Sequence, residues 1–154
     1  MVFVTISSKE AEQYAYICKR LKSVVNNMCT ARKTLEAVAN ASFDKSFAKC
    51  MYMLTSESLQ CENEIRAHID CMVCNDYEDE QHVENKKIMP LNKIGTVEGI
   101  CDFFENSYMK WYKKLLKNKH FGLSLKNLIQ NHLQQFNWSL MQMRLFNDVQ
   151  TNLN

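Results

Sequence analysis

The sequence predicts an all-α fold, a four-helix bundle in one domain over residues 1–154. The chain has only three glycines and one proline, and all four lie after residue 89. Folds built from strands and turns need more of these residues than that. A length of 154 residues with 46% hydrophobic content suits one core that needs no disulfide or metal staple. Apolar residues recur at spacings of three and four in four long segments, which is the period of an amphipathic helix.

The first helix is expected over residues 8–39. Ser7-Ser8-Lys9-Glu10 fits a capping box, in which a serine and a glutamate three residues later satisfy free backbone donors. At about 1.5 Å per residue the helix would reach roughly 48 Å, which is a bundle length. Its apolar line consists of Tyr14, Cys18, Leu21, Val25, Met28 and Leu35.

The second helix is expected over residues 44–72. Its inner line combines apolar and ionisable side chains, unlike that of the first helix. The line consists of Phe47, Met51, Leu54, Glu57, Cys61, Glu64 or Ile65, and His68.

The third and fourth helices are expected over residues 97–118 and 124–149, and Gly122 is expected to close the third. The third carries Cys101, Phe104, Tyr108, Trp111 and Leu115. The fourth carries Leu128 or Ile129, His132, Phe136, Leu140, Met143 and Phe146.

Short connections within each pair of helices predict two antiparallel hairpins. The segment between the hairpins, residues 75–96, is long and polar, and it contains the only proline. Fully extended, it would span about 70 Å, enough to return along a bundle. One long crossover in the middle of the chain is typical of ferritin-like bundles, so this connectivity is the expected one.

Charge and composition exclude several classes of partner. The 19 basic and 17 acidic residues give a net charge of +2, too small to favour nucleic acid or an anionic membrane. No apolar run approaches the roughly 20 residues of a membrane span, and the start lacks the pattern of a signal peptide. Seven cysteines, an odd number at mostly helical spacings, favour reduced buried thiols. We therefore expect a cytoplasmic protein.

Acidic residues on the expected inner faces are candidates for a metal site. Glu57, Glu64 and His68 lie near one side of the second helix, where bundle cores hold metal ligands. With Glu36 on the first helix and Glu105 on the third, they could supply oxygen and imidazole donors to iron or manganese.

The polar residues of these helices also fit roles outside an iron or manganese site. The carboxylates of the second helix could instead reach water, or Arg32 on the inner line of the first helix. Cys71-Met72-Val73-Cys74, with His68 and His82, could hold zinc, although packing explains two thiols at a helix end equally well. His132 fits a hydrogen-bonded core histidine, and the fourth helix offers no acidic ligand beside it.

The chain resembles a family of small bacterial ferritin-like four-helix-bundle proteins of unknown function over residues 20–148. The resemblance rests on Phe47 followed by Glu57 and Glu64-Ile65, on the segment from Glu105 to Tyr112, and on Leu128-Ile129-Gln130 leading to Arg144-Leu145. It implies a ferritin-like fold and an ancestral metal site at Glu57, Glu64 and Glu105.

The chain departs from this family at two of the positions that would hold the metal. Glu105-Asn106 stands where the family has an acidic pair. Leu140-Met141 stands where the family has a His-Asp pair on the fourth helix. A metal site between the four helices would thus lack ligands from the fourth helix.

Two functions follow as hypotheses. No Ser/His/Asp set, glycine-rich phosphate loop or GxSxG turn is present, so no catalytic residue is predicted and a non-enzymatic role is favoured. The first hypothesis is a bundle with a degenerate metal site and no resident cofactor, which forms a homo-oligomer or binds a protein partner. The alternative is a carboxylate-bridged protein that binds or oxidises iron or manganese.

Overall fold

All regular structure in the described part of the chain is helical. The computed structural model describes residues 8–72 and 95–153. Its helices are α1 Ser8–Ala41, α2 Lys45–Cys71, α3 Val97–Asn106, α4 Tyr108–Leu116 and α5 Leu123–Leu153. The all-α prediction is confirmed, and these bounds lie close to the predicted ones except in the third segment.

The third predicted helix, residues 97–118, is two helices. Ser107 leaves the helical region with φ −123° and ψ −81°, and its hydroxyl donates to the carbonyl of Phe103 at 2.5 Å. This bond competes with the backbone pattern of a continuous helix, a known tendency of serine within helices. The segment therefore ends as α3 and restarts as α4, which finishes at Leu116.

Helix ends follow local capping chemistry. The Asp44 carboxylate accepts from the backbone N–H groups of Ser46 and Phe47, and the Thr96 hydroxyl accepts from Gly99 N–H. The prediction that Gly122 closes the third helix is wrong, because Gly122 lies immediately before α5 and its carbonyl accepts from Lys126 N–H. The expected capping box begins at Ser7, outside the described residues.

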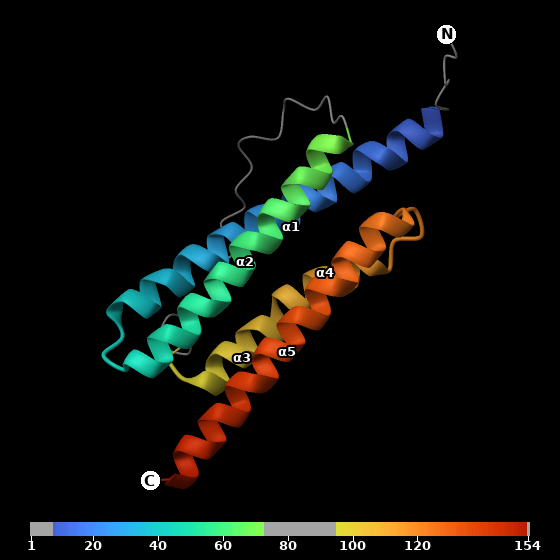
Figure 1. The fold of residues 1–154 in the computed structure, drawn as a ribbon. Helices are drawn as coiled ribbons and strands as arrows, with labels where there is room; N and C mark the ends of the chain where they lie inside the picture. The colour runs from blue at the N-terminus through green and yellow to red at the C-terminus, as the bar shows by residue number, and fades with distance from the viewer. Residues whose placement is uncertain (1–7, 73–94, 154) are drawn as a thin grey trace.

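The helices form two antiparallel hairpins that pack side by side (Figure 1). α1 packs on α2 and α4 packs on α5, while α1 also contacts α4 and α2 also contacts α5. α2 ends at one end of the bundle, and α3 begins at the other. The predicted crossover, residues 75–96, lies outside the described residues except at Gly95 and Thr96.

The core follows most of the predicted apolar lines. Leu21, Met28 and Leu35 of α1 are buried, as are Ile129 and Phe136 of α5. Two predicted line members, Tyr14 and Phe146, are exposed because they lie toward the ends of their long helices. None of the helices in the described ranges is long and apolar enough to cross a membrane.

The interior is also aromatic. The ring of Tyr108 stacks on Phe104 with a centroid distance of 4.4 Å, and Phe136 of α5 lies 5.3 Å from Tyr108. Tyr112 stacks on the same Phe136 ring at 5.9 Å. These contacts join α3, α4 and α5 at the middle of the bundle.

One cysteine corrects the expectation that all seven thiols are reduced. Cys18 is buried and disulfide-bonded. Five other cysteines are free thiols: Cys29, Cys50, Cys61, Cys71 and Cys101. Burial raises the pKa of Cys61 to about 12 and that of Cys101 to about 11, so both remain protonated and unreactive at neutral pH.

Candidate functional site

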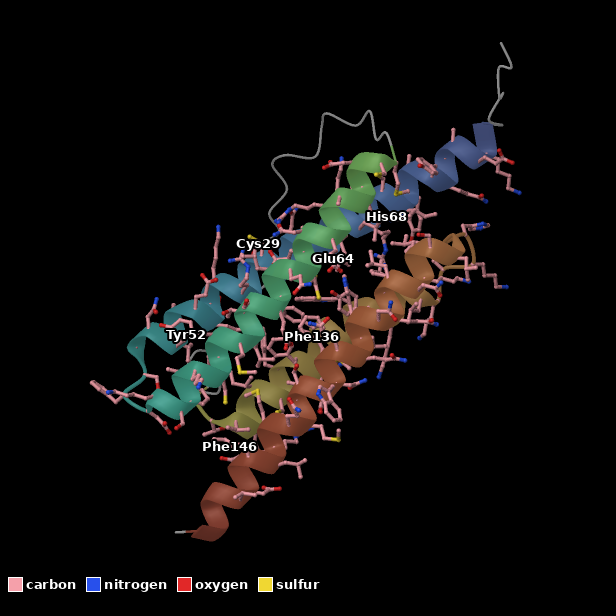
Figure 2. The ribbon with its side chains drawn as sticks, viewed as in Figure 1. Cys29, Tyr52, Glu64, His68, Phe136 and Phe146 are labelled. Carbon is pink, nitrogen blue, oxygen red and sulfur yellow. The ribbon has the colours of Figure 1, made fainter. Side chains whose placement is uncertain are left out.

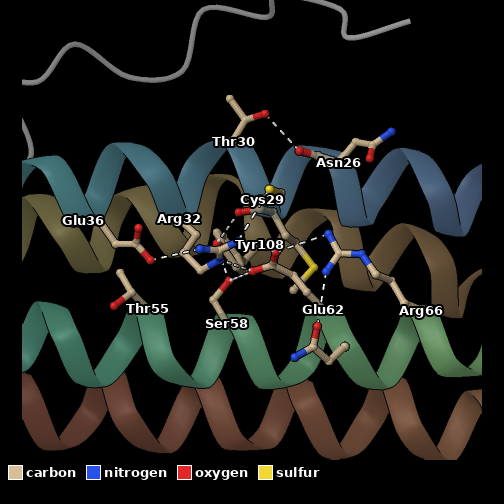
Figure 3. A network of polar contacts seen from close by, with 12 residues as sticks. Asn26, Cys29, Thr30, Arg32, Glu36, Thr55, Ser58, Glu62, Arg66 and Tyr108 are labelled. Atoms are coloured by element: carbon tan, nitrogen blue, oxygen red, sulfur yellow. Dashed lines mark hydrogen bonds and ion pairs between the residues drawn. The ribbon is translucent and has the colours of Figure 1, made fainter. Parts of the chain in front are cut away.

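The most deeply buried charged group among the described residues is a carboxylate of α2. It does not belong to the inner line predicted for the second helix. Glu62 on α2 is 0% exposed and faces Arg32 on α1 (Figure 3). Arg32 Nε donates to one carboxylate oxygen at 2.8 Å, and Nη2 donates to the other at 3.3 Å. This bidentate geometry, with two N–H groups donating to the two carboxylate oxygens, is the strongest form of arginine–carboxylate pairing.

Further contacts compensate both charges. Arg32 Nη1 donates to Glu36 one turn along α1 at 3.0 Å, and Arg66 approaches Glu62 at 3.8 Å. The hydrogen bond to Glu62 raises the pKa of Arg32 further above its ordinary value, although burial acts in the opposite direction. The guanidinium therefore stays charged inside the α1–α2 contact.

Two hydroxyl groups extend this ion pair into the centre of the bundle. Ser58 Oγ donates to Glu62 at 3.0 Å and lies 2.7 Å from the hydroxyl of Tyr108. With the serine hydrogen on Glu62, Tyr108 donates either to Ser58 or to the carbonyl of Met28 at 3.1 Å. Burial raises the pKa of Tyr108 well above its ordinary value, so the phenol keeps its proton. The group Arg32–Glu62–Ser58–Tyr108, hereafter the buried polar group, thus links α1, α2 and α4.

A second chain of contacts connects α2 with α4 and α5. Glu64 Oε2 lies 2.5 Å from His132 Nε2, and His132 Nδ1 lies 3.3 Å from the Tyr112 hydroxyl. Burial raises the pKa of Tyr112, so its hydroxyl can donate to Nδ1 while Nε2–H donates to Glu64. His132 is buried, and the interpretation of it as a hydrogen-bonded core histidine is confirmed.

The five predicted metal ligands are separated in the structure. Glu57 accepts from Ser139 Oγ of α5 at 2.8 Å through both oxygens. Glu64 pairs with His132, and Glu36 pairs with Arg32. Glu105 pairs with Arg144 at 2.7 Å. His68 lies one turn beyond Glu64 on α2 (Figure 2).

No three of these residues share one site. In residues 8–72 and 95–153, no group of three or more His, Cys, Asp or Glu side chains is placed to hold a metal ion. The proposed zinc site needs Cys74 and His82, which lie outside the described residues. Glu57, Glu64 and Glu105 each pair instead with a side chain of α5, whereas Glu36 pairs with Arg32 of its own helix.

Among the five predicted metal ligands, Glu57 has the most unusual environment. It lines a groove of about 350 Å³ between α2 and α5, together with Met53, Leu54, Met143 and Phe146. Burial raises the pKa of Glu57, and the hydrogen bond from Ser139 opposes this only in part. Its carboxyl group therefore takes up a proton more readily than an exposed glutamate.

The sequence reasoning missed Glu62, Ser58 and Ser139 as polar core members. One signal was available for Glu62, because Ser58 and Glu62 lie four residues apart on α2, and Arg32 on the inner line of α1 needs an acidic neighbour. The hypothesis that Arg32 reaches Glu57 or Glu64 is wrong, because Arg32 pairs with Glu62, whereas Glu57 and Glu64 pair with Ser139 and His132.

Comparison with other proteins adds no functional residue. No protein-family model, curated protein or solved structure matches this chain.

Proposed function

We propose that the protein is a non-catalytic helical bundle that acts by self-association, as a homodimer joined through the outer face of α5. The observation that carries this proposal is an apolar row on that face, the α5 stripe. Its members are Trp138, Met141, Leu145 and Val149, which are 57%, 47%, 58% and 56% exposed. Spacings of three, four and four residues place all four on one side of the helix.

The rest of this outer face carries little charge, and its one charged side chain is Asp148, three residues beyond Leu145. Toward the start of α5 the same side continues with amide side chains, namely Asn127, Asn131 and Gln134, all exposed. Solvated helix faces normally carry charged residues, whereas the centres of protein interfaces are depleted in them. An exposed row of four large apolar side chains is thus a feature of an interaction surface.

The partner that best suits this surface is a second copy of the chain. A two-fold contact brings the same residues of both copies together, so a charged face would repel itself. The α5 stripe has no charged member, and the amides beside it can both donate and accept hydrogen bonds. Two antiparallel α5 helices can therefore cover each other's stripe without burying an unpaired charge.

Ferritin-like connectivity is part of the proposal. The neighbour pattern supports it, because α1 lies beside α4, α2 lies beside α5, and α2 ends at the opposite end of the bundle from the start of α3. In this view the buried polar group replaces a metal site, with the guanidinium of Arg32 as the cation inside the bundle. The pairing of the predicted ligands within the protein supports a degenerate site.

The first test is the oligomeric state of the purified protein by light scattering at micromolar concentration. We expect a dimer for the native chain and a monomer for Leu145→Glu, since a charge would have to be buried at the contact. Leu59→Glu is the matched control, because Leu59 is an exposed leucine on α2, away from the outer face of α5. A monomeric native protein, or equal effects of the two variants, contradicts the proposal.

The alternative of iron or manganese binding is decided on the same sample. Elemental analysis of untreated protein and titration with Fe(II), Mn(II) and Zn(II) should give less than about one equivalent bound. Glu64→Ala tests the role of one predicted ligand. Binding of a full equivalent that is lost in Glu64→Ala would favour the metal-binding function instead.

A further inference from the structure

A basic cleft lies where the first half of α1 meets the turn between α4 and α5. Its volume is about 450 Å³. Residues distant in sequence build it, from α1, from the end of α4 and from the turn. The lining consists of Tyr16, Arg20, Lys114, Leu115, Lys117, Asn118, Lys119, His120 and Phe121.

The lining combines four permanent positive charges with no acidic residue. Arg20, Lys114, Lys117 and Lys119 carry these charges. The sequence around the turn offers no compensation either, because no aspartate or glutamate occurs between Glu105 and Asp148. The net charge of +2 conceals this separation, since most acidic residues lie before Asn106.

Specific contacts hold the cleft together. Gln13, Tyr16 and Arg20 lie three and four residues apart on α1, so they share the face toward the turn. The side chains of Gln13 and His120 meet at 3.3 Å, and the His120 backbone N–H donates to Asn118 Oδ1 at 3.0 Å. The guanidinium of Arg20 lies 6.0 Å from the ring centre of Tyr16. The charges are thus held by three separate segments.

The helix dipole explains only part of this arrangement. Cations near the C-terminal end of a helix are stabilising, which accounts for Lys114 in the last turn of α4 and for Lys117 at its C-cap. It does not account for Arg20, which comes from α1, or for Lys119, which lies beyond the helix end. Like charges gathered in one cleft repel one another, so a multiply charged anion would relieve an existing strain.

We propose that this basic cleft binds a small ligand carrying two or more linked phosphate groups. Several cations within one cleft match several anionic oxygens, and lysine and arginine are the usual phosphate binders. Such a phosphate chain could be free polyphosphate or the tail of a nucleotide. Tyr16 is exposed at the edge of the cleft and offers a ring on which a base could stack.

Calorimetric titration with tripolyphosphate at low salt tests the proposal. We expect saturable one-to-one binding that weakens as salt is added, because the cations are at the surface. Arg20→Gln and Lys117→Gln should each weaken binding about three- to fivefold, the range of one exposed ion pair. Lys110→Gln is the matched control: it removes one exposed charge from α4 outside the cleft and should leave binding unchanged.

ATP and sulfate complete the test. Equal binding of ATP and tripolyphosphate identifies the phosphate chain alone as the ligand, whereas tighter ATP binding that Tyr16→Ala abolishes identifies a nucleotide. Sulfate, which has one anionic group, should bind much more weakly. The proposal is overturned by the absence of saturable binding, by sulfate binding as tight as tripolyphosphate, or by an equal effect of Lys110→Gln and Lys117→Gln.

Discussion

At the scale of single residues, the buried pair of Arg32 and Glu62 governs the polar interior. Glu62 is fully buried and accepts from Arg32 and Ser58, whereas the Arg32 side chain is 13% exposed. Removing the carboxylate charge leaves the guanidinium without its two-pronged partner. We expect Glu62→Gln to lower the free energy of unfolding by about 3 kcal/mol, as measured by urea denaturation.

Two variants separate this effect from a general loss of charge. Glu36→Gln removes the other carboxylate bound to Arg32, but it lies at the surface and should cost less than about 1 kcal/mol. The double variant Arg32→Met with Glu62→Leu removes both charges and should recover much of the loss. Equal costs for Glu62→Gln and Glu36→Gln would show that the buried pair does not dominate.

Glu57 provides a prediction for pH dependence. Its pKa is raised in the folded protein, so the folded state binds the proton more tightly than the unfolded state. Stability is then lost as pH rises from the ordinary carboxyl pKa through the raised one. Glu57→Gln removes this loss and keeps an oxygen that can accept from Ser139. We expect the variant to be more stable than the native protein near neutral pH.

The comparison needs urea midpoints at a series of pH values. The advantage of Glu57→Gln should shrink as pH falls below the ordinary carboxyl pKa, because the native carboxyl group is then neutral in both states. Glu12→Gln, at an exposed position of α1, controls for the change of charge alone. A constant difference at every pH would refute the assignment to burial of Glu57.

At the scale of helices, the sequence predicted where the helices lie better than where they end. Apolar periodicity over long segments located α1, α2 and α5, because an amphipathic stripe repeats many times in each. The break at Ser107 was missed because one side chain bonded to Phe103 creates it, with no proline or glycine as a signal. Gly122 was assigned to the wrong helix, since a glycine between two helices fits either end.

The hardest feature to predict was which side chains of α2 face the neighbouring helices. This helix contacts both α1 and α5, so it buries more than one row of side chains. Glu62 lies on the side toward Arg32 of α1, whereas Glu57 and Glu64 reach Ser139 and His132 of α5. A single inner line cannot describe a helix with two neighbours. Each candidate metal ligand lies on the helix where it was predicted. The packing of those helices, however, keeps the five side chains apart.

At the scale of the whole molecule, two surface features lie at opposite ends of the bundle. The α5 stripe occupies the second half of α5, while the basic cleft lies at the turn before α5 begins (Figure 1). One surface is apolar and uncharged, and the other is cationic. Self-association and phosphate binding should therefore be separable, and added salt should weaken only the second.

Thermal unfolding tests the dimer as a property of the whole molecule. If folding and association are coupled, the Tm rises with protein concentration, by about 4 °C over a hundredfold range for a dimer of this size. The same series on Leu145→Glu should give a Tm that does not depend on concentration, because that variant is expected to be monomeric. Repeating the native series in high salt separates the driving forces. An apolar contact keeps its concentration dependence when charges are screened, whereas association through exposed charges loses it.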